Sequence, residues 1–287
     1  MKTALYFERV GNQSVNCFLC PHLCRIPEGK RGICRVRVNL GGELIAMNYG
    51  KVASLMMDPI EKKPLHRFFP GSSILSAGTF GCNLTCDYCQ NHDLVQMTDS
   101  RYELTPAQLA QIAAQEGGLG LAYTYNEPTI WYEYVLDTAK EVHRMGLKNV
   151  LVTNGYINPE PFLELAAFVD GMNIDLKSMK DEYYQKICGG RVLPVLETIR
   201  SAFAQGIHLE ITTLLIPGLN TSDEDIHELC RWIRDVDPGI PLHLSRYFPA
   251  YKRRTPSTEL ETMVRAGQIA REYLETVILG NMPMKGV

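Results

Sequence analysis

The sequence predicts an α/β fold: an incomplete (β/α)6 TIM-like barrel with a small N-terminal Cys-rich module. From about residue 73, six short apolar, β-rich runs alternate with longer amphipathic stretches. This alternation implies right-handed βαβ units with parallel strands, and six units are too few for a closed eight-stranded barrel. The region before it holds four cysteines and few helical stripes. We therefore expect a module at 1–70 and a barrel at 71–287, with a flavodoxin-like open sheet as the alternative.

Each strand is predicted from an apolar run, and each helix from a capping residue or from apolar residues at helical spacing. The six predicted strands are 74–78, 119–125, 149–153, 171–176, 208–216 and 242–247. Thr105 and Pro106 start a helix as N-cap and first residue, and Gly117 stops it. Helical stripes follow at Tyr132, Val135, Leu136, Ala139 and Val142, at Ile226, Leu229, Cys230 and Ile233, and in a last helix at about 258–274. In the module, 43–47 and 52–56 are predicted strands and 58–64 a connector.

Composition excludes several classes of protein. The 287 residues include 29 basic and 32 acidic side chains, a net charge of −3. This balance gives no electrostatic case for nucleic acid or for an anionic membrane. No apolar run approaches the roughly 18 residues of a membrane span. Glu8 and Arg9 interrupt what would be the apolar core of a signal peptide, so the expected location is cytoplasmic.

The nine cysteines stand out, because seven of them fall in two tight clusters. Clustered cysteines in a cytoplasmic chain favour metal binding over disulfides, and the odd total argues against a complete disulfide framework. Cys82, Cys86 and Cys89 follow the first predicted strand with the spacing C-x3-C-x2-C. Thiolates suit iron–sulfur clusters, and three ligands for a [4Fe–4S] cluster leave one iron open. A zinc knuckle completed by His92 is the alternative.

This motif resembles that of the radical S-adenosylmethionine (SAM) superfamily. The resemblance implies a [4Fe–4S] cluster whose open iron is chelated by the amino and carboxylate groups of SAM. It also implies one-electron cleavage of SAM to methionine and a 5′-deoxyadenosyl radical that abstracts hydrogen from a substrate. In such a barrel, functional residues lie at the carboxyl ends of the strands.

The residues at the strand ends match this family in part. Asn126 and Glu127, in Tyr-Asn-Glu-Pro, resemble the G-G-E-P motif that meets the SAM amino group, although both glycines are replaced. Thr153 and Asn154, followed by Gly155, resemble the T-N-G of glycyl-radical activases, which lines the SAM site. A helix-capping role is the alternative for Glu127.

Asp175 and Lys177 point the same way because strand side chains alternate, and they suit the two ends of an amino acid. They match the D-x-K of the same activases; a strand-end salt bridge is the alternative. The resemblance also implies an adenine contact at the Ile216 backbone and a ribose contact at His243, for which core packing is the alternative. Thr212 and Glu210 share one face of their strand and are predicted to point into the barrel.

Three further side chains are candidates for roles in the predicted site. Tyr88 matches an aromatic residue that packs near the adenine. Cys188 is a candidate hydrogen donor or substrate contact, with an inert loop thiol as the alternative, and Glu210 is the other candidate catalytic residue. Cys230 lies on an apolar helical face and is predicted to pack in the core.

The four N-terminal cysteines form a second predicted metal site. Cys17, Cys20, Cys24 and Cys34 have the spacing C-x2-C-x3-C-x9-C. Four thiolates close a site, so either a structural zinc or an auxiliary [4Fe–4S] cluster is consistent with them. His22 is an alternative ligand. Basic residues around this site suit an acidic electron donor such as flavodoxin or ferredoxin, or form a solvated face.

The combined motifs resemble AmmeMemoRadiSam-type radical SAM enzymes, which are similar to pyruvate formate-lyase activating enzymes. They include Cys-x2-Cys-Pro-His-x-Cys, Asp58 to Pro64, Gly78 to Cys82, Tyr125 to Pro128 and His243 to Pro249. The family name points to AMMECR-like and Memo-like partner proteins. The leading hypothesis is a radical SAM enzyme acting on a protein, peptide or small molecule. The alternatives are an activase of a glycyl radical enzyme and a non-catalytic iron–sulfur sensor.

Overall fold

A computed structural model describes residues 1–283. Its centre is an eight-stranded sheet with the order β16-β15-β14-β13-β12-β11-β9-β8. The strands are β8 (Ser54–Pro59), β9 (Ser73–Gly78), β11 (Gly120–Tyr123), β12 (Lys148–Thr153), β13 (Gly171–Asp175), β14 (His208–Leu215), β15 (Leu242–Arg246) and β16 (Val277–Gly280). All neighbours are parallel except β8 and β9, which are antiparallel. Because β8 and β16 do not pair with each other, the barrel is incomplete, as predicted.

The six predicted parallel strands are all present in sequential order, so the alternative of a flavodoxin-like sheet is wrong. The structure adds a seventh parallel strand, β16, at the far edge. The predicted strand 52–56 overlaps β8, which joins the near edge of this sheet and not a sheet of the N-terminal module. The proposed division of the chain at residue 70 stays a prediction.

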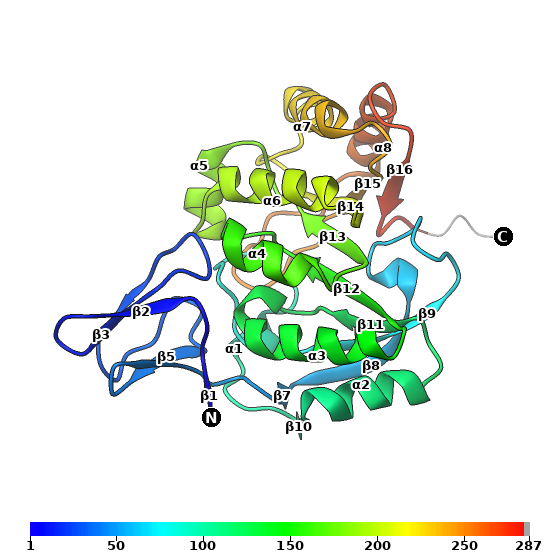
Figure 1. The fold of residues 1–287 in the computed structure, drawn as a ribbon. Helices are drawn as coiled ribbons and strands as arrows, with labels where there is room; N and C mark the ends of the chain where they lie inside the picture. The colour runs from blue at the N-terminus through cyan, green and yellow to red at the C-terminus, as the bar shows by residue number, and fades with distance from the viewer. Residues whose placement is uncertain (284–287) are drawn as a thin grey trace.

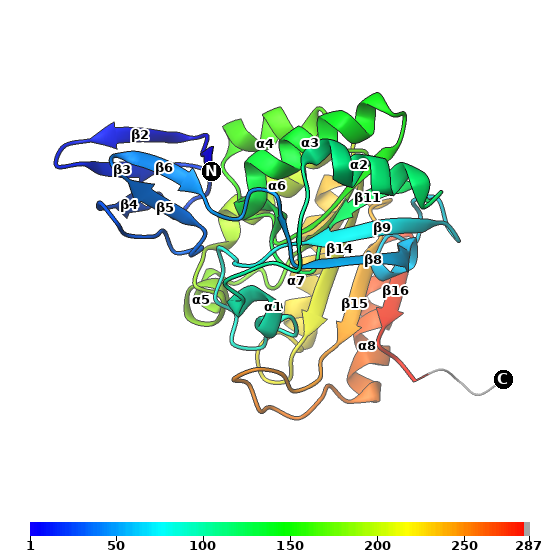
Figure 2. The same ribbon diagram turned by 90° about the horizontal axis from the view of Figure 1, so that it is seen from below.

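Helices cover the sheet as the βαβ pattern requires (Figures 1 and 2). They are α1 (His92–Gln96), α2 (Pro106–Gln115), α3 (Tyr132–Arg144), α4 (Pro159–Ala166), α5 (Asp181–Tyr183), α6 (Val192–Ala204), α7 (Asp223–Val236) and α8 (Leu260–Ala270). Seen from below, α2, α3, α4 and α6 lie in a row along one face. Thr105 caps α2 in a reciprocal capping box with Gln108, which explains its start. The last helix, α8, is shorter than the predicted 258–274.

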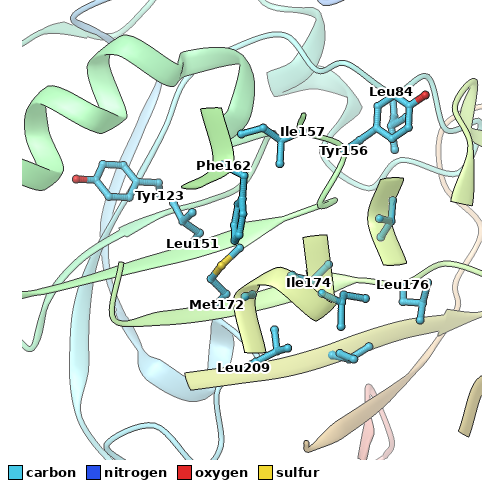
Figure 3. Close-up of a cluster of buried hydrophobic side chains, with 14 of the residues drawn as sticks. Leu84, Tyr123, Leu151, Tyr156, Ile157, Phe162, Met172, Ile174, Leu176 and Leu209 are labelled. Atoms are coloured by element: carbon cyan, nitrogen blue, oxygen red, sulfur yellow. The ribbon is translucent and has the colours of Figure 1, made fainter. Parts of the chain in front are cut away.

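The main core lies between the helices and the sheet (Figure 3). Phe162 from α4 faces Leu151 of β12 and Met172 of β13, all three nearly inaccessible to solvent. Cys230, as predicted, is fully buried in this core. Burying each such side chain contributes about 1.5–3 kcal/mol to the stability of the fold. This packing holds the strands, and with them the strand ends where the candidate site lies. No helix in residues 1–283 is both long enough and apolar enough to cross a membrane.

The N-terminal region forms two small sheets beside the barrel (Figure 1). One has the order β1-β6-β5 and the other β2-β3-β4. Their strands are β1 (Lys2–Thr3), β2 (Phe7–Val10), β3 (Ser14–Cys17), β4 (Arg25–Ile26), β5 (Arg37–Leu40) and β6 (Glu43–Ala46), and a separate pair joins β7 (Lys51–Val52) to β10 (Tyr102–Glu103).

The predicted connector at 58–64 is wrong in part. Asp58 and Pro59 end β8, and Ile60–Lys62 form a 3-10 turn. Asp58 and Lys63 are buried, with Lys63 Nζ 2.8 Å from Asp58 Oδ2. Tyr125 also donates its hydroxyl to Asp58. These two charges, which made the segment look like a solvated linker, instead form a buried ion pair.

Candidate active site

The three clustered cysteines lie on the loop that leaves β9 at the carboxyl edge of the sheet. The Leu84 backbone N–H donates to Cys82 Sγ at 3.3 Å, while the Leu84 side chain is buried in the core (Figure 3). Asn126 holds the start of the loop, accepting from Thr79 N–H and donating to Gly81 carbonyl, both at 3.0 Å. The loop is therefore held by packing and by hydrogen bonds within the protein.

The end of β12 reaches the first of these cysteines. Asn154 Nδ2 lies 3.8 Å from Cys82 Sγ and 2.9 Å from Asn83 Oδ1. Asn83 in turn donates to the Tyr156 carbonyl at 2.7 Å. The predicted site residue Asn154 thus lies beside a cluster cysteine. Asn83 was missed, since an asparagine after a cysteine has no pattern of its own.

Glu127 joins the ends of β11 and β12. Its carboxylate accepts from Thr129 N–H, from the Thr153 hydroxyl at 2.7 Å and from Asn154 N–H at 2.8 Å. The Thr129 bond caps the next helical turn, which was the alternative role predicted for it. Burial raises the pKa of Glu127, against the lowering effect of these hydrogen bonds. Glu127 and Thr153 thereby set the position of the Asn154 backbone.

The second cysteine contacts the turn after α5. Cys188 ends a π-helical turn, Tyr184–Cys188, and is fully buried. Its carbonyl accepts from Thr85 N–H at 2.8 Å, and its Sγ lies 3.6 Å from the Tyr88 hydroxyl. A hydrogen bond with the Cys188 thiol lowers the pKa of Cys86 below its usual value. Cys188 and Tyr88 are thus packed against a cluster cysteine, and single π turns often mark functional sites.

Asp175 and Lys177 form an ion pair at the end of β13, confirming that they point the same way. Lys177 Nζ lies 2.9 Å from Asp175 Oδ2, with the lysine side chain 13% and the aspartate 40% exposed. Burial lowers the pKa of Lys177, but the negative charges of Asp175 and then Cys86 raise it by more. The pKa of Lys177 therefore lies well above its usual value. The pair therefore presents both charges beside the cysteine loop.

A segment after β15 is tied to the same loop. Arg253 makes a bidentate ion pair with Asp87, at 2.9 Å from Nε and 2.7 Å from Nη2. The backbone N–H groups of Lys252 and Arg253 also donate to the Asp87 carbonyl. Tyr251 stacks on His92, with ring centroids 4.8 Å apart. Sequence reasoning missed this pairing, because 166 residues separate the partners.

Two predicted contact residues, Thr212 on β14 and Ile216 directly after it, already form hydrogen bonds within the protein. Thr212 is buried and donates to Asn173 Oδ1 at 2.9 Å. Ile216 is fully buried, and its backbone N–H donates to Asn220 Oδ1 at 2.7 Å. Its carbonyl accepts from Leu219 N–H at 3.1 Å. An adenine contact through the Ile216 backbone competes with these bonds.

The positions of His243 and Glu210 argue against the predicted roles. His243 Nε2 lies 2.6 Å from Glu210 Oε2, and its ring packs on His66. His66 belongs to the loop between β8 and β9, at the amino ends of the parallel strands, whereas the cysteine loop lies at their carboxyl ends. His243 was assigned by its motif and by its expected register with the other strand ends, but it is the second residue of β15 and lies near the amino end of that strand.

Glu210 is the centre of a closed hydrogen-bond network. Its carboxylate also accepts from His208 Nε2 at 2.9 Å and from the backbone N–H groups of His66 and Arg67. Burial raises its pKa, but the bonds from His208, His243 and the two backbone groups outweigh burial and lower it to about 2. A carboxylate with four donors has no free position for proton transfer. These four bonds hold Glu210 at the amino ends of the strands, at the opposite edge of the sheet from the cysteine loop.

The four N-terminal cysteines line one cavity. This confirms the prediction that their side chains lie together in the fold. Cys17 and Cys34 are buried, and Cys20 and Cys24 are partly exposed. His22, the alternative ligand, lines the cavity with its Nε2 2.7 Å from the Asn83 carbonyl oxygen. Burial raises the pKa values of Cys17, Cys20 and Cys34, so these thiols need a bound cation to ionise.

The spacing of the sulfur atoms tests which metal group fits. Within residues 1–283, the single set of three or more metal-ligand side chains with all ligand atoms within 4.8 Å is His66, Glu210 and His243. Neither cysteine cluster meets that limit. A [4Fe–4S] cluster binds each thiolate at a different iron, so it needs more widely spaced sulfurs than a single ion does. The absence of Cys82, Cys86 and Cys89 from that set argues against a single ion and agrees with a [4Fe–4S] cluster.

Comparisons with known proteins agree with this geometry. The family model described as "Radical SAM superfamily" matches residues 77–233. The protein MJ0808 of Methanocaldococcus jannaschii is 40% identical over 99% of this chain and 86% of its own length. The pyruvate formate-lyase 1-activating enzyme of Escherichia coli is 27% identical over 61% of this chain and 74% of its own.

A solved structure shares the fold. Streptococcus suis SuiB bound to S-adenosylmethionine matches 79% of this chain and 54% of its own, with a TM-score of 0.58 and 16% identity. With a family match over more than half of its length, a cysteine loop of the required spacing and this fold, the chain belongs to the radical SAM superfamily, whose cofactors are a [4Fe–4S] cluster and SAM.

Proposed function

We propose that the protein is an enzyme that reductively cleaves SAM and abstracts a hydrogen atom from a substrate presented at the carboxyl end of the barrel. The observation that carries this proposal is the convergence of three strand ends on one cysteine loop. Asn126, after β11, donates to the Gly81 carbonyl, and Asn154, after β12, lies 3.8 Å from Cys82 Sγ. The Asp175–Lys177 ion pair lies at the end of the next strand, β13. When bound, the cluster on Cys82, Cys86 and Cys89 supplies the electron that cleaves SAM to methionine and a 5′-deoxyadenosyl radical.

The chain's own residues have positioning and binding roles in this proposal. Lys177 and Asp175 carry opposite charges that complement the carboxylate and amino groups of SAM. Asn126, Glu127 and Thr153 hold the backbone around the SAM pocket, and Tyr88 packs beside the cluster. Residues 251–253, the strap after β15, are tied to the cysteine loop by the Arg253–Asp87 ion pair, and this strap limits the access of water to the loop.

Within this chemistry, a glycyl radical enzyme is one candidate class of partner. The name of the E. coli relative says that it activates pyruvate formate-lyase. At 27% identity, this supports an activating-enzyme role as the second candidate rather than the first. A glycyl doublet in the EPR spectrum of a partner protein, appearing only with SAM and reductant, is the expected sign of this activity.

The N-terminal motif and the Asp58 to Pro64 segment support the AmmeMemoRadiSam subtype within the superfamily. On that basis, AMMECR-like and Memo-like proteins are the proposed partners. A flavodoxin or ferredoxin is the proposed electron donor. Copurification with tagged protein under anaerobic conditions tests each of these partners.

The experiment for the proposed activity is an anaerobic assay of 5′-deoxyadenosine with reconstituted protein, dithionite and SAM. Wild type is expected to form the product, and Cys86→Ala to fall to background. Cys230→Ala, which changes a cysteine in the core, is the matched control and should retain the activity. A loaded, reduced wild type that binds SAM and forms no product, with or without candidate partners, would favour the non-catalytic sensor.

A further inference from the structure

We infer that Cys17, Cys20, Cys24 and Cys34 hold a second [4Fe–4S] cluster that passes electrons to the first. The inference deepens the proposed function, and only its electron-relay part rests on that function. The identity of the metal group rests on the geometry of the N-terminal cavity alone. A structural zinc is the competing occupant.

The spacing of the four sulfurs argues against zinc. A tetrahedral zinc has Zn–S bonds of about 2.3 Å, which places its sulfurs roughly 3.8 Å apart. No three of these four Sγ atoms lie within 4.8 Å of one another. The cysteines of the radical SAM motif also fall outside that limit, and they serve as an internal reference for a four-iron site. Neither site therefore has three sulfurs as close together as a tetrahedral zinc requires.

A buried cation beside the cavity also suits a cluster that is reduced. Arg37 lines the cavity with 1% of its surface exposed. Its Nη2 pairs with Glu133 at 2.6 Å, but its Nε has no hydrogen-bond partner within residues 1–283. Four thiolates around a [4Fe–4S] core carry a net negative charge, and reduction adds one more. A guanidinium N–H is a suitable donor to such an anion.

The two cysteine sites are adjacent, because the residues on either side of Cys82 contact the N-terminal site. Asn83 lines the N-terminal cavity and directly follows Cys82 in the chain. On the other side of Cys82, Gly81 has φ +86°, and a Cβ there would lie 2.7 Å from the Cys34 carbonyl oxygen. Cys82 is therefore flanked on both sides by residues that contact the N-terminal site. That proximity suits electron transfer between them.

The electron balance of the relay is simple. A one-electron carrier of the flavodoxin or ferredoxin class is oxidised as it reduces the N-terminal cluster from the 2+ to the 1+ state. That cluster returns to 2+ as the cluster on Cys82, Cys86 and Cys89 takes the electron. Cys20 and Cys24 are the partly exposed ligands and lie nearest to solvent, where a carrier would dock.

The first test determines the metal without SAM chemistry. The triple variant Cys82→Ala, Cys86→Ala and Cys89→Ala is offered iron, sulfide and zinc together under anaerobic conditions. We expect about four iron and four sulfide per chain, against about eight of each in wild type, and an EPR signal on reduction that SAM leaves unchanged. One zinc per chain with no sulfide overturns the proposal, even if the wild type cleaves SAM.

The second test measures the relay. Cys20→Ser with Cys24→Ser should retain about four iron per chain and should cleave SAM with dithionite, which is small enough to reduce the remaining cluster directly. With reduced flavodoxin as donor, we expect at least a tenfold loss of rate relative to wild type. Equal rates with flavodoxin overturn the relay. Loss of activity with both reductants, despite four iron per chain, also contradicts the relay, because the N-terminal site would then be needed for a step other than electron delivery.

Discussion

The side-chain amide nitrogen of Asn154 lies 3.8 Å from Cys82 Sγ. Asn154 follows the last residue of β12, and Cys82 lies on the loop after β9, so this contact joins two strand ends across β11. Hydrogen bonds to cluster sulfurs tune the reduction potential. The strand order therefore affects the electronic properties of the site as well as its shape.

Removing that amide should make the cluster harder to reduce. A neutral hydrogen bond is worth about 1 kcal/mol, which is roughly 40 mV for one electron. We expect Asn154→Leu to lower the potential of the cluster on Cys82, Cys86 and Cys89 by about that amount in an EPR-monitored redox titration. Asn158→Leu is the matched control, because the Asn158 side-chain amide donates to the Phe18 carbonyl and not to sulfur. An unchanged or higher potential in Asn154→Leu contradicts the contact.

The charged pair at the end of β13 should determine SAM affinity. A charge-assisted hydrogen bond is worth about 1.5–3 kcal/mol, so Lys177→Met and Asp175→Asn should each weaken SAM binding by roughly 10- to 100-fold. Iron content should stay unchanged. Lys186→Met removes the lysine of an exposed ion pair with Glu182 and should have no effect. Equilibrium binding of SAM to the loaded protein is the measurement, and unaltered affinity in both pair variants would refute the assignment.

The strap over the cysteine loop should protect the cluster from air. Arg253→Met removes the bidentate contact with Asp87, so oxygen and water reach the loop more often. We expect the iron–sulfur absorbance of the variant to decay several-fold faster on aeration. Arg254→Met changes an exposed neighbouring arginine and should decay like wild type. Equal decay of Arg253→Met and Arg254→Met would show that the strap gives no protection.

Glu210 should make the stability of the fold depend on acid pH. Its pKa is lowered to about 2 in the folded chain, so its ionised form stabilises the fold above its unfolded pKa. That contribution is lost as the pH falls from about 5 towards 2, and it amounts to roughly 2–3 kcal/mol. The difference in unfolding free energy between wild type and Glu210→Gln should shrink over this range. A difference that does not vary with pH would mean that Glu210 is not held as the anion.

The fold could be predicted from sequence because its information is local. The capping pattern at Thr105 and the apolar runs of the strands fix elements that the parallel topology then orders. The cysteine loops were equally accessible, since ligand spacing is visible along the chain. The predictions that were wrong depended on strand register or on contacts between residues whose pairing is not visible in the sequence. Asp58 and Lys63 looked solvated but pair inside the barrel, and His243 matched a motif yet faces Glu210 and His66.

The most direct test of the central claim is the EPR spectrum of the reduced cluster with and without SAM. Cys20→Ser with Cys24→Ser leaves only the cluster on Cys82, Cys86 and Cys89 to observe. If SAM chelates the open iron of that cluster, its addition changes the g values of the reduced signal, and the signal then decays as 5′-deoxyadenosine forms, at up to one per electron. A reduced signal that saturating SAM leaves unchanged would contradict the account.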